Sequence, residues 1–115
     1  MPHDLSSNPE IIATMEAYLE TTRPPIEIRP QLDIGYELVG QSVILNEIRP
    51  VWRAPHDIQH QPYAKATYVK SRNLWKVYWM RASLKWDAYD PKPTVKTLRA
   101  FLKLVDEDKY GCFKG

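Results

Sequence analysis

Residues 64–86 constrain the fold most, because apolar and polar side chains alternate along them. The side chains of a β-strand point alternately to the two faces of its sheet. Turn-forming residues at 71–73, with a less regular turn at 82–83, divide this segment. The pattern predicts two or three consecutive antiparallel strands at the centre of a small sheet. One face should be apolar and covered by helices, while the opposite face should present Lys65, Lys76, Lys85 and Tyr78.

A hairpin and two helices are expected around this centre. Ser7 and Glu10 have the spacing of a capping box around Pro9, which predicts an N-terminal helix. Residues 34–48 predict a hairpin that turns near Gly40. Thr94 is the expected cap of a C-terminal helix, whose buried stripe should contain Val95, Leu98, Leu102 and Val105.

These elements predict an α+β fold. The expected architecture is an antiparallel sheet of about five strands, formed by a two-strand hairpin and a three-strand meander, with an N-terminal and a C-terminal helix packed on one face. The 115 residues should form a single domain. We expect residues 1–7 to be disordered. Residues 50–63 contain three prolines and two histidines, and we expect them to form a surface loop.

The sequence favours a cytoplasmic protein without membrane association. No apolar run approaches the length of a membrane span, and the N-terminus has no basic segment followed by an apolar one. The single Cys112 has no partner for an internal disulfide, which is typical of a reducing compartment.

The charge is distributed unevenly along the chain. Residues 64–103 contain ten Lys or Arg residues against Asp87 and Asp90, a net charge of +8, although the whole chain has only +2. Such asymmetry indicates an acidic partner, here RNA or single-stranded DNA, whose phosphates meet cations while bases stack on aromatic rings. The expected binding residues are Lys65, Lys70, Arg72, Lys76, Tyr78, Arg81, Lys85, Lys96, Arg99 and Lys103.

Other functions compete with nucleic-acid binding. The acidic first half could pack against the basic half and cancel its charge, or the same surfaces could contact another protein or a second copy of the chain. A metal-dependent nuclease would use Asp33, Glu47 and Lys65 on neighbouring strands. Its compact acid-x-lysine signature is incomplete, because Arg49 follows Glu47 at that spacing.

A catalytic or metal role has no complete motif. His56 and His60 are four residues apart, a spacing that places two metal ligands on one face of a helix, but prolines flank them. Cys112 has no histidine beside it in sequence. We therefore expect a binding module rather than an enzyme, with no cofactor, no metal and no catalytic residue.

Several short segments resemble a family. They include DIGY at 33–36, EIRP at 47–50, AKATYVK at 64–70, WKVYW at 75–79, LKW at 84–86, VDED at 105–108 and GCF at 111–113. In order and spacing they are similar to a small bacterial single-domain family known only as a domain of unknown function, over residues 23–115. The resemblance implies no established activity and no catalytic residues to transfer.

Overall fold

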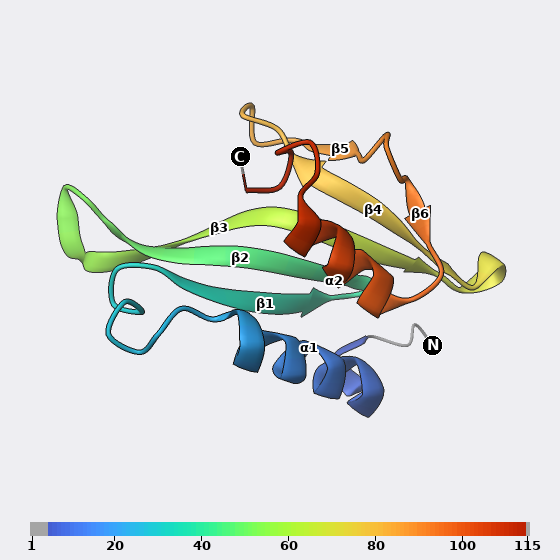
Figure 1. The fold of residues 1–115 in the computed structure, drawn as a ribbon, viewed down its shortest axis with the longest axis horizontal. Helices are drawn as coiled ribbons and strands as arrows, with labels where there is room; N and C mark the ends of the chain where they lie inside the picture. Colours follow the sequence, from blue (N-terminus) through green and yellow to red (C-terminus); the bar gives the residue numbers. More distant parts are fainter. Residues whose placement is uncertain (1–4, 115) are drawn as a thin grey trace.

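The computed structural model describes residues 5–114, with the side chain of Pro55 left out. An antiparallel sheet forms one layer, and two helices form the second layer on one of its faces (Figure 1). The predicted α+β class is confirmed. In chain order the elements are η1 (Leu5–Ser7), α1 (Pro9–Thr22), β1 (Asp33–Val39), β2 (Ser42–Val51), β3 (Ala54–Val69), η2 (Lys70–Arg72), β4 (Leu74–Met80), β5 (Trp86–Ala88), β6 (Thr94–Val95) and α2 (Leu98–Glu107).

The sheet has the strand order β1-β2-β3-β4-β5, and β6 also pairs with β4. β5 pairs with residues 78–80 of β4 and β6 with residues 75–76, on the edge of β4 that β3 leaves free. The two short strands therefore lie end to end along one edge. The predicted hairpin turn is confirmed at Gly40, whose φ of 57° favours glycine.

The core lies between the sheet and the helices. Cross-strand neighbours share a face, so the register assigns six buried residues to one side of the sheet: Val43, Leu45, Ala64, Ala66, Trp75 and Val77. We call this side the covered face. Met15 of α1 and Phe101 and Val105 of α2 are fully buried in the same cluster. The apolar face therefore holds both helices, as the alternation predicts.

The expectation of a surface loop at residues 50–63 is wrong. These residues contain the β2–β3 hairpin turn, and β3 begins at Ala54. β2 and β3 extend beyond their neighbours as a two-stranded arm, residues 49–62, which protrudes from the sheet (Figure 1). Each strand of the arm has one unpaired edge, so prolines fit there without the loss of a ladder hydrogen bond. The prolines therefore indicated edge strands and not a loop.

The helix starts differ from the predicted ones. Asn8, not Ser7, caps α1, because its side chain accepts hydrogen bonds from the backbone N–H groups of Glu10 and Ile11. Thr97, not Thr94, caps α2 by accepting from the N–H of Ala100. Thr94 instead belongs to β6. Pairing with β4 therefore overrides the local helix signal at this position.

The prediction that residues 1–7 are disordered is wrong for residues 5–7. Residues 5–7 form a short 3-10 helix, in which Leu5 is buried and donates its N–H to the carbonyl of Gly40. Residues 1–4, which the same expectation included, lie outside the described residues. No helix within residues 5–114 is long and apolar enough to cross a membrane.

Asp108, the residue directly after α2, fixes the path of the chain up to Lys114. Asp108 adopts a left-handed conformation with a φ of 38°, and its carboxylate accepts the N–H groups of Phe113 and Lys114. This turn directs the Phe113 ring onto Tyr89, at a centroid distance of 4.7 Å. The Asp108 turn therefore closes the core at this end of the helix layer.

Candidate nucleic-acid interface

The side of the sheet opposite the helices has a cluster of a cation and two aromatic rings. Lys65 pairs with Tyr78 across β3 and β4, and Met80 pairs with Trp86 across β4 and β5. All four side chains therefore share this side. Together with the exposed Lys76 they form what we call the open face. The predicted exclusion of the helices from the lysine side is confirmed.

The Lys65 ammonium lies over both rings of the cluster. It is 4.7 Å from the ring centroid of Tyr78 and 4.9 Å from that of Trp86, which are cation–π distances. Partial burial lowers the pKa of Lys65. None of the three ion pairs between described residues includes Lys65, so no carboxylate neutralises this cation. An approaching anion would therefore meet an uncompensated positive charge.

Lys76 extends this cationic surface towards β6. It pairs with Thr67 of β3 on one edge and with Thr94 of β6 on the other. The polar hydroxyls of Ser42 and Thr67 are 2.7 Å apart on the same face. An acidic residue, Glu37, occupies the β1 side of the face, where it pairs with Ile44. The two lysines of the open face, Lys65 and Lys76, therefore lie on β3 and β4, and β5 contributes the Trp86 ring.

Four of the other predicted binding residues lie at the two ends of β4. Lys70 and Arg72 belong to η2 in the β3–β4 turn, which Asn73 closes in a left-handed conformation. Arg81 follows β4 and lies 3.8 Å from the Asp87 carboxylate. Lys85 was expected on the strand face, but it lies in the turn before β5. Its expected place is occupied by Trp86.

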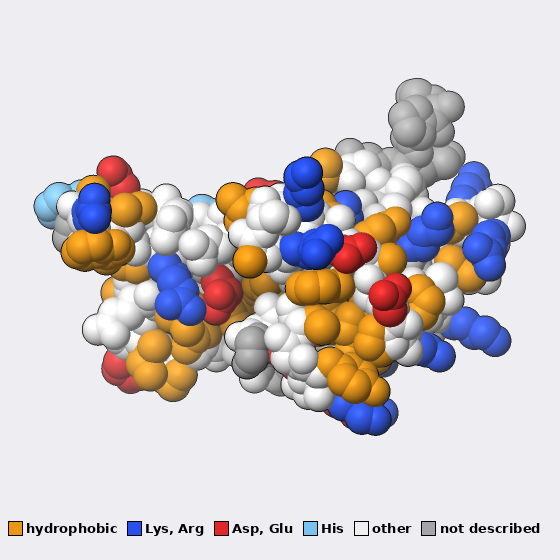
Figure 2. Space-filling view, turned by 90° about the horizontal axis from the view of Figure 1, so that it is seen from above, with side chains coloured by type: hydrophobic (Ala, Val, Ile, Leu, Met, Phe, Trp, Pro, Cys, Tyr) orange, Lys and Arg blue, Asp and Glu red, His pale blue; other side chains and the backbone are white. Residues whose placement is uncertain are grey.

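The last three predicted residues are on the helix side. Arg99 and Lys103 are exposed residues of α2, and Lys96 precedes this helix. A strand lying on the open face cannot also contact α2, because the sheet separates the two sides. Figure 2 shows Lys and Arg side chains gathered towards the end of the molecule at which Figure 1 places the β3–β4 turn.

Alternation alone predicted Lys85 on the open face, but the structure places Trp86 there. Residues 86–88 do alternate between the two faces, but which of them point to the open face is decided by the register between β4 and β5. Three residues, Ala82, Ser83 and Leu84, connect Arg81 to Lys85, and Leu84 adopts a left-handed φ of 64°. No glycine or asparagine marks this turn, so the sequence offered no signal for the register.

The structure does not bring the proposed nuclease residues together. Asp33 pairs with Ile48, while Glu47 pairs with Ile34, so the two carboxylates point to opposite faces of the sheet. Each carboxylate has an arginine partner: Asp33 binds Arg23 at 2.6 Å, and Glu47 binds Arg49 at 3.1 Å. The Arg23 hydrogen bonds lower the pKa of Asp33. These acids are therefore ion-pair partners of arginines and do not form a metal site.

The two histidines lie on the arm. His56 and His60 are exposed residues of β3, where a spacing of four places them on one side of an extended strand, about 13 Å apart at 3.3 Å per residue. Within the described part of the chain, no group of three His, Cys, Asp or Glu side chains could hold a metal ion. The arm also exposes Trp52 and Ile58.

Comparison with known proteins yields one match. The family model described as Domain of unknown function (DUF3024) matches residues 4–115. No curated protein and no solved structure matches the chain. The match agrees with the resemblance drawn from the short segments, and it extends this resemblance to include the N-terminal helix.

Proposed function

We propose that this chain, which belongs to the DUF3024 family, binds single-stranded nucleic acid, either RNA or DNA, on the open face of its sheet. The observation that supports the proposal is the cluster of Lys65, Tyr78 and Trp86 on a side that no helix covers. A cytoplasmic location, expected from the single Cys112, is part of the proposal.

The chemistry of the open face suits a single strand better than a duplex. Phosphates would contact Lys65 and Lys76, and an unpaired base could stack on the rings of Tyr78 or Trp86. Stacking of this kind contributes about 1–3 kcal/mol per base. β4 has seven residues and is therefore about 23 Å long, enough to contact several nucleotides. Lys70 and Arg72 extend the cationic path beyond one end of this strand.

A pair of charge-reversed variants tests the assignment to this face. In the first, Lys65→Glu and Lys76→Glu alter the open face. In the second, Lys103→Glu and Lys109→Glu alter exposed positions at α2 and directly after it. Both variants change the formal net charge from +2 to −2, because each replaces two cations by two anions. Net charge alone therefore cannot explain a difference between them.

The measurement is the fluorescence anisotropy of labelled single-stranded oligonucleotides of RNA and of DNA. We expect the open-face variant to lose at least about tenfold in affinity, and the helix-side variant to keep most of it. Trp86→Ala should also weaken binding about fivefold or more, through lost stacking. Circular dichroism confirms that each variant is folded. Equal losses in the two charge-reversed variants would contradict the proposal.

A role in protein interaction, the alternative function, is favoured by a different surface. The helix layer, on the side opposite the open face, has a groove whose lining includes the charged residues Arg99, Lys103 and Asp106. This groove belongs to neither the arm nor the open face.

A further inference from the structure

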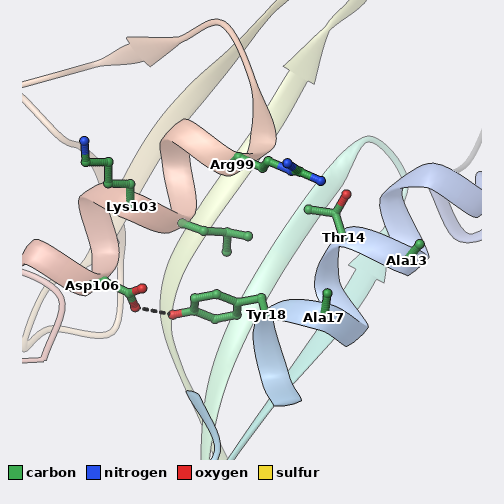
Figure 3. Close-up of a pocket in the computed structure, with 8 residues that line it drawn as sticks. Ala13, Thr14, Ala17, Tyr18, Arg99, Lys103 and Asp106 are labelled. Carbon is green, nitrogen blue, oxygen red and sulfur yellow. Dashed lines mark hydrogen bonds between the residues drawn. The ribbon is translucent and has the colours of Figure 1, made fainter. Parts of the chain in front are cut away.

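A groove runs between the two helices on the side away from the sheet. Its volume is about 600 Å³, and it is lined by Ala13, Thr14, Ala17, Tyr18, Arg99, Leu102, Lys103 and Asp106 (Figure 3). At one end the Tyr18 hydroxyl donates a 2.8 Å hydrogen bond to the Asp106 carboxylate, which ties α1 to α2. The groove is therefore a fixed feature of the helix layer.

The α2 side of the groove is cationic from the start of the helix to its middle. Arg99 extends over the groove towards Thr14 of α1, and Lys103, one turn further, points to solvent (Figure 3). Neither residue belongs to any of the three ion pairs between described residues. Asp106, the acidic residue of the lining, is engaged by Tyr18 near the other end of α2. The α2 wall therefore offers two positive charges without an ion-pair partner among the described residues, Arg99 and Lys103.

The α1 side has the opposite charge. Helix α1 contains Glu10, Glu16 and Glu20 and no lysine or arginine, a net charge of −3. Glu16 accepts a hydrogen bond from the Tyr36 hydroxyl, while no ion pair of the described chain involves Glu10 or Glu20. These two glutamates form one exposed stripe with the alanines between them, at spacings of three and four: Glu10, Ala13, Ala17 and Glu20.

We propose that the helix layer is a docking surface for a second copy of this chain. In a two-fold arrangement, the acidic stripe of each α1 lies against the α1–α2 groove of the other copy, where it meets Arg99 and Lys103. A two-fold interface uses the same surface on both copies, so that surface must contain both the acidic residues and the basic residues that pair with them. The helix layer contains both, the acidic residues on α1 and the basic residues on α2. The small side chains of Ala13 and Ala17 allow the helices to approach closely.

This interface goes beyond nucleic-acid binding and does not compete with it. The two helix layers would form the centre of the dimer, and the open faces of the two sheets would point outwards on opposite sides. A dimer would therefore present two separate open faces. Loss of the dimer would leave each open face intact, so the two proposals can fail independently.

Sedimentation velocity of the wild-type chain and of two variants tests the interface. The first variant has Glu10→Lys and Glu20→Lys, which make the α1 stripe basic. The second has Arg99→Glu and Lys103→Glu, which make the α2 wall acidic. All four positions are exposed, so both variants should fold. We expect the wild type to be dimeric at about 100 µM chain, and each variant to be monomeric.

Mixing the two variants gives the sharpest result. Their opposed charges restore both contacts across the two-fold axis, so an equimolar mixture should form a heterodimer, although neither variant dimerises alone. Glu27→Lys, an exposed reversal in the loop after α1, is the control and should stay dimeric. A monomeric wild type, a dimer that persists in both variants, or a mixture that stays monomeric would each overturn the proposal.

Discussion

Replacement of Tyr63 by phenylalanine should stabilise the protein, although Tyr63 belongs to the core. The side chain is 6% exposed, and its hydroxyl is the buried side-chain polar atom of residues 5–114 for which no hydrogen-bond partner is found. Tyr63 lies at a bulge, where β3 has one residue more than β2 between the pairs Leu45–Ala64 and Asn46–Pro62. The bulge explains how a polar group comes to lie unpaired in the core.

The expected gain follows from the desolvation of the hydroxyl. A buried polar group without a partner costs about 1–3 kcal/mol. Loss of the oxygen leaves a small void, which offsets part of this gain. We therefore expect Tyr63→Phe to raise the free energy of unfolding by about 1 kcal/mol. For a chain of this size, that corresponds to an increase of about 4 °C in the melting temperature. The hydroxyl is neutral near pH 7, because burial, Glu47 and Asp106 all raise its pKa.

Urea unfolding measures this difference, and Tyr18→Phe is the matched control. Tyr18 is also buried, but its hydroxyl donates to Asp106. The same change should therefore lower the free energy of unfolding at Tyr18, by about 1 kcal/mol, and raise it at Tyr63. The denaturant dependence should stay unchanged in both variants. Destabilisation of the Tyr63 variant would refute the reasoning, because it would mean that the hydroxyl has a favourable partner.

Three further outcomes test other parts of the account. Asp33→Asn should lower the free energy of unfolding by about 0.5–1 kcal/mol at pH 7, because it removes a bidentate but partly exposed ion pair with Arg23. Since this pair lowers the pKa of Asp33, the difference from wild type should vanish as the pH falls below about 4, and urea titrations at each pH measure it. Gly40→Ala should lower the free energy of unfolding by about 1 kcal/mol, and with it the melting temperature, because a φ of 57° disfavours a residue with a side chain even where space is free. Burial and Glu16 raise the pKa of Tyr36 to about 12. The free energy of unfolding of wild type should therefore fall towards that of Tyr36→Phe between pH 10 and pH 12, whereas a constant difference between the two would contradict this.

The alternation of side chains was sufficient to predict the layers of the fold. A strand with Trp75 and Val77 on one face and Lys76 and Tyr78 on the other can bury only the first, so the helices had to cover that side. The same reasoning failed for Trp86, because its face is set by the register of a hairpin whose turn residues have no strong preference. The prolines of the arm misled in another way. They exclude a central strand, but they do not exclude an edge strand.

Two features could not be predicted without the tertiary structure: the residue at which α2 begins, and the division of the lysines and arginines between the two sides of the sheet. Thr94 and Thr97 are both acceptable caps, and only the pairing of Thr94 with Lys76 decides between them. Lys96, Arg99 and Lys103 continue the basic run of the sheet along the sequence. The chain crosses from the sheet edge to the helix layer between β6 and α2, so these residues belong to a different surface.

The most direct test of the proposed open-face interface is the salt dependence of binding between the wild-type chain and a single-stranded oligonucleotide. Two phosphate contacts, to Lys65 and Lys76, predict a slope of about −1.4 in a plot of log affinity against log salt concentration, and additional contacts to Lys70 and Arg72 would make it steeper. The account therefore predicts tight binding at low salt that weakens at moderate salt with this slope or a steeper one. An absence of binding even at low salt would contradict it.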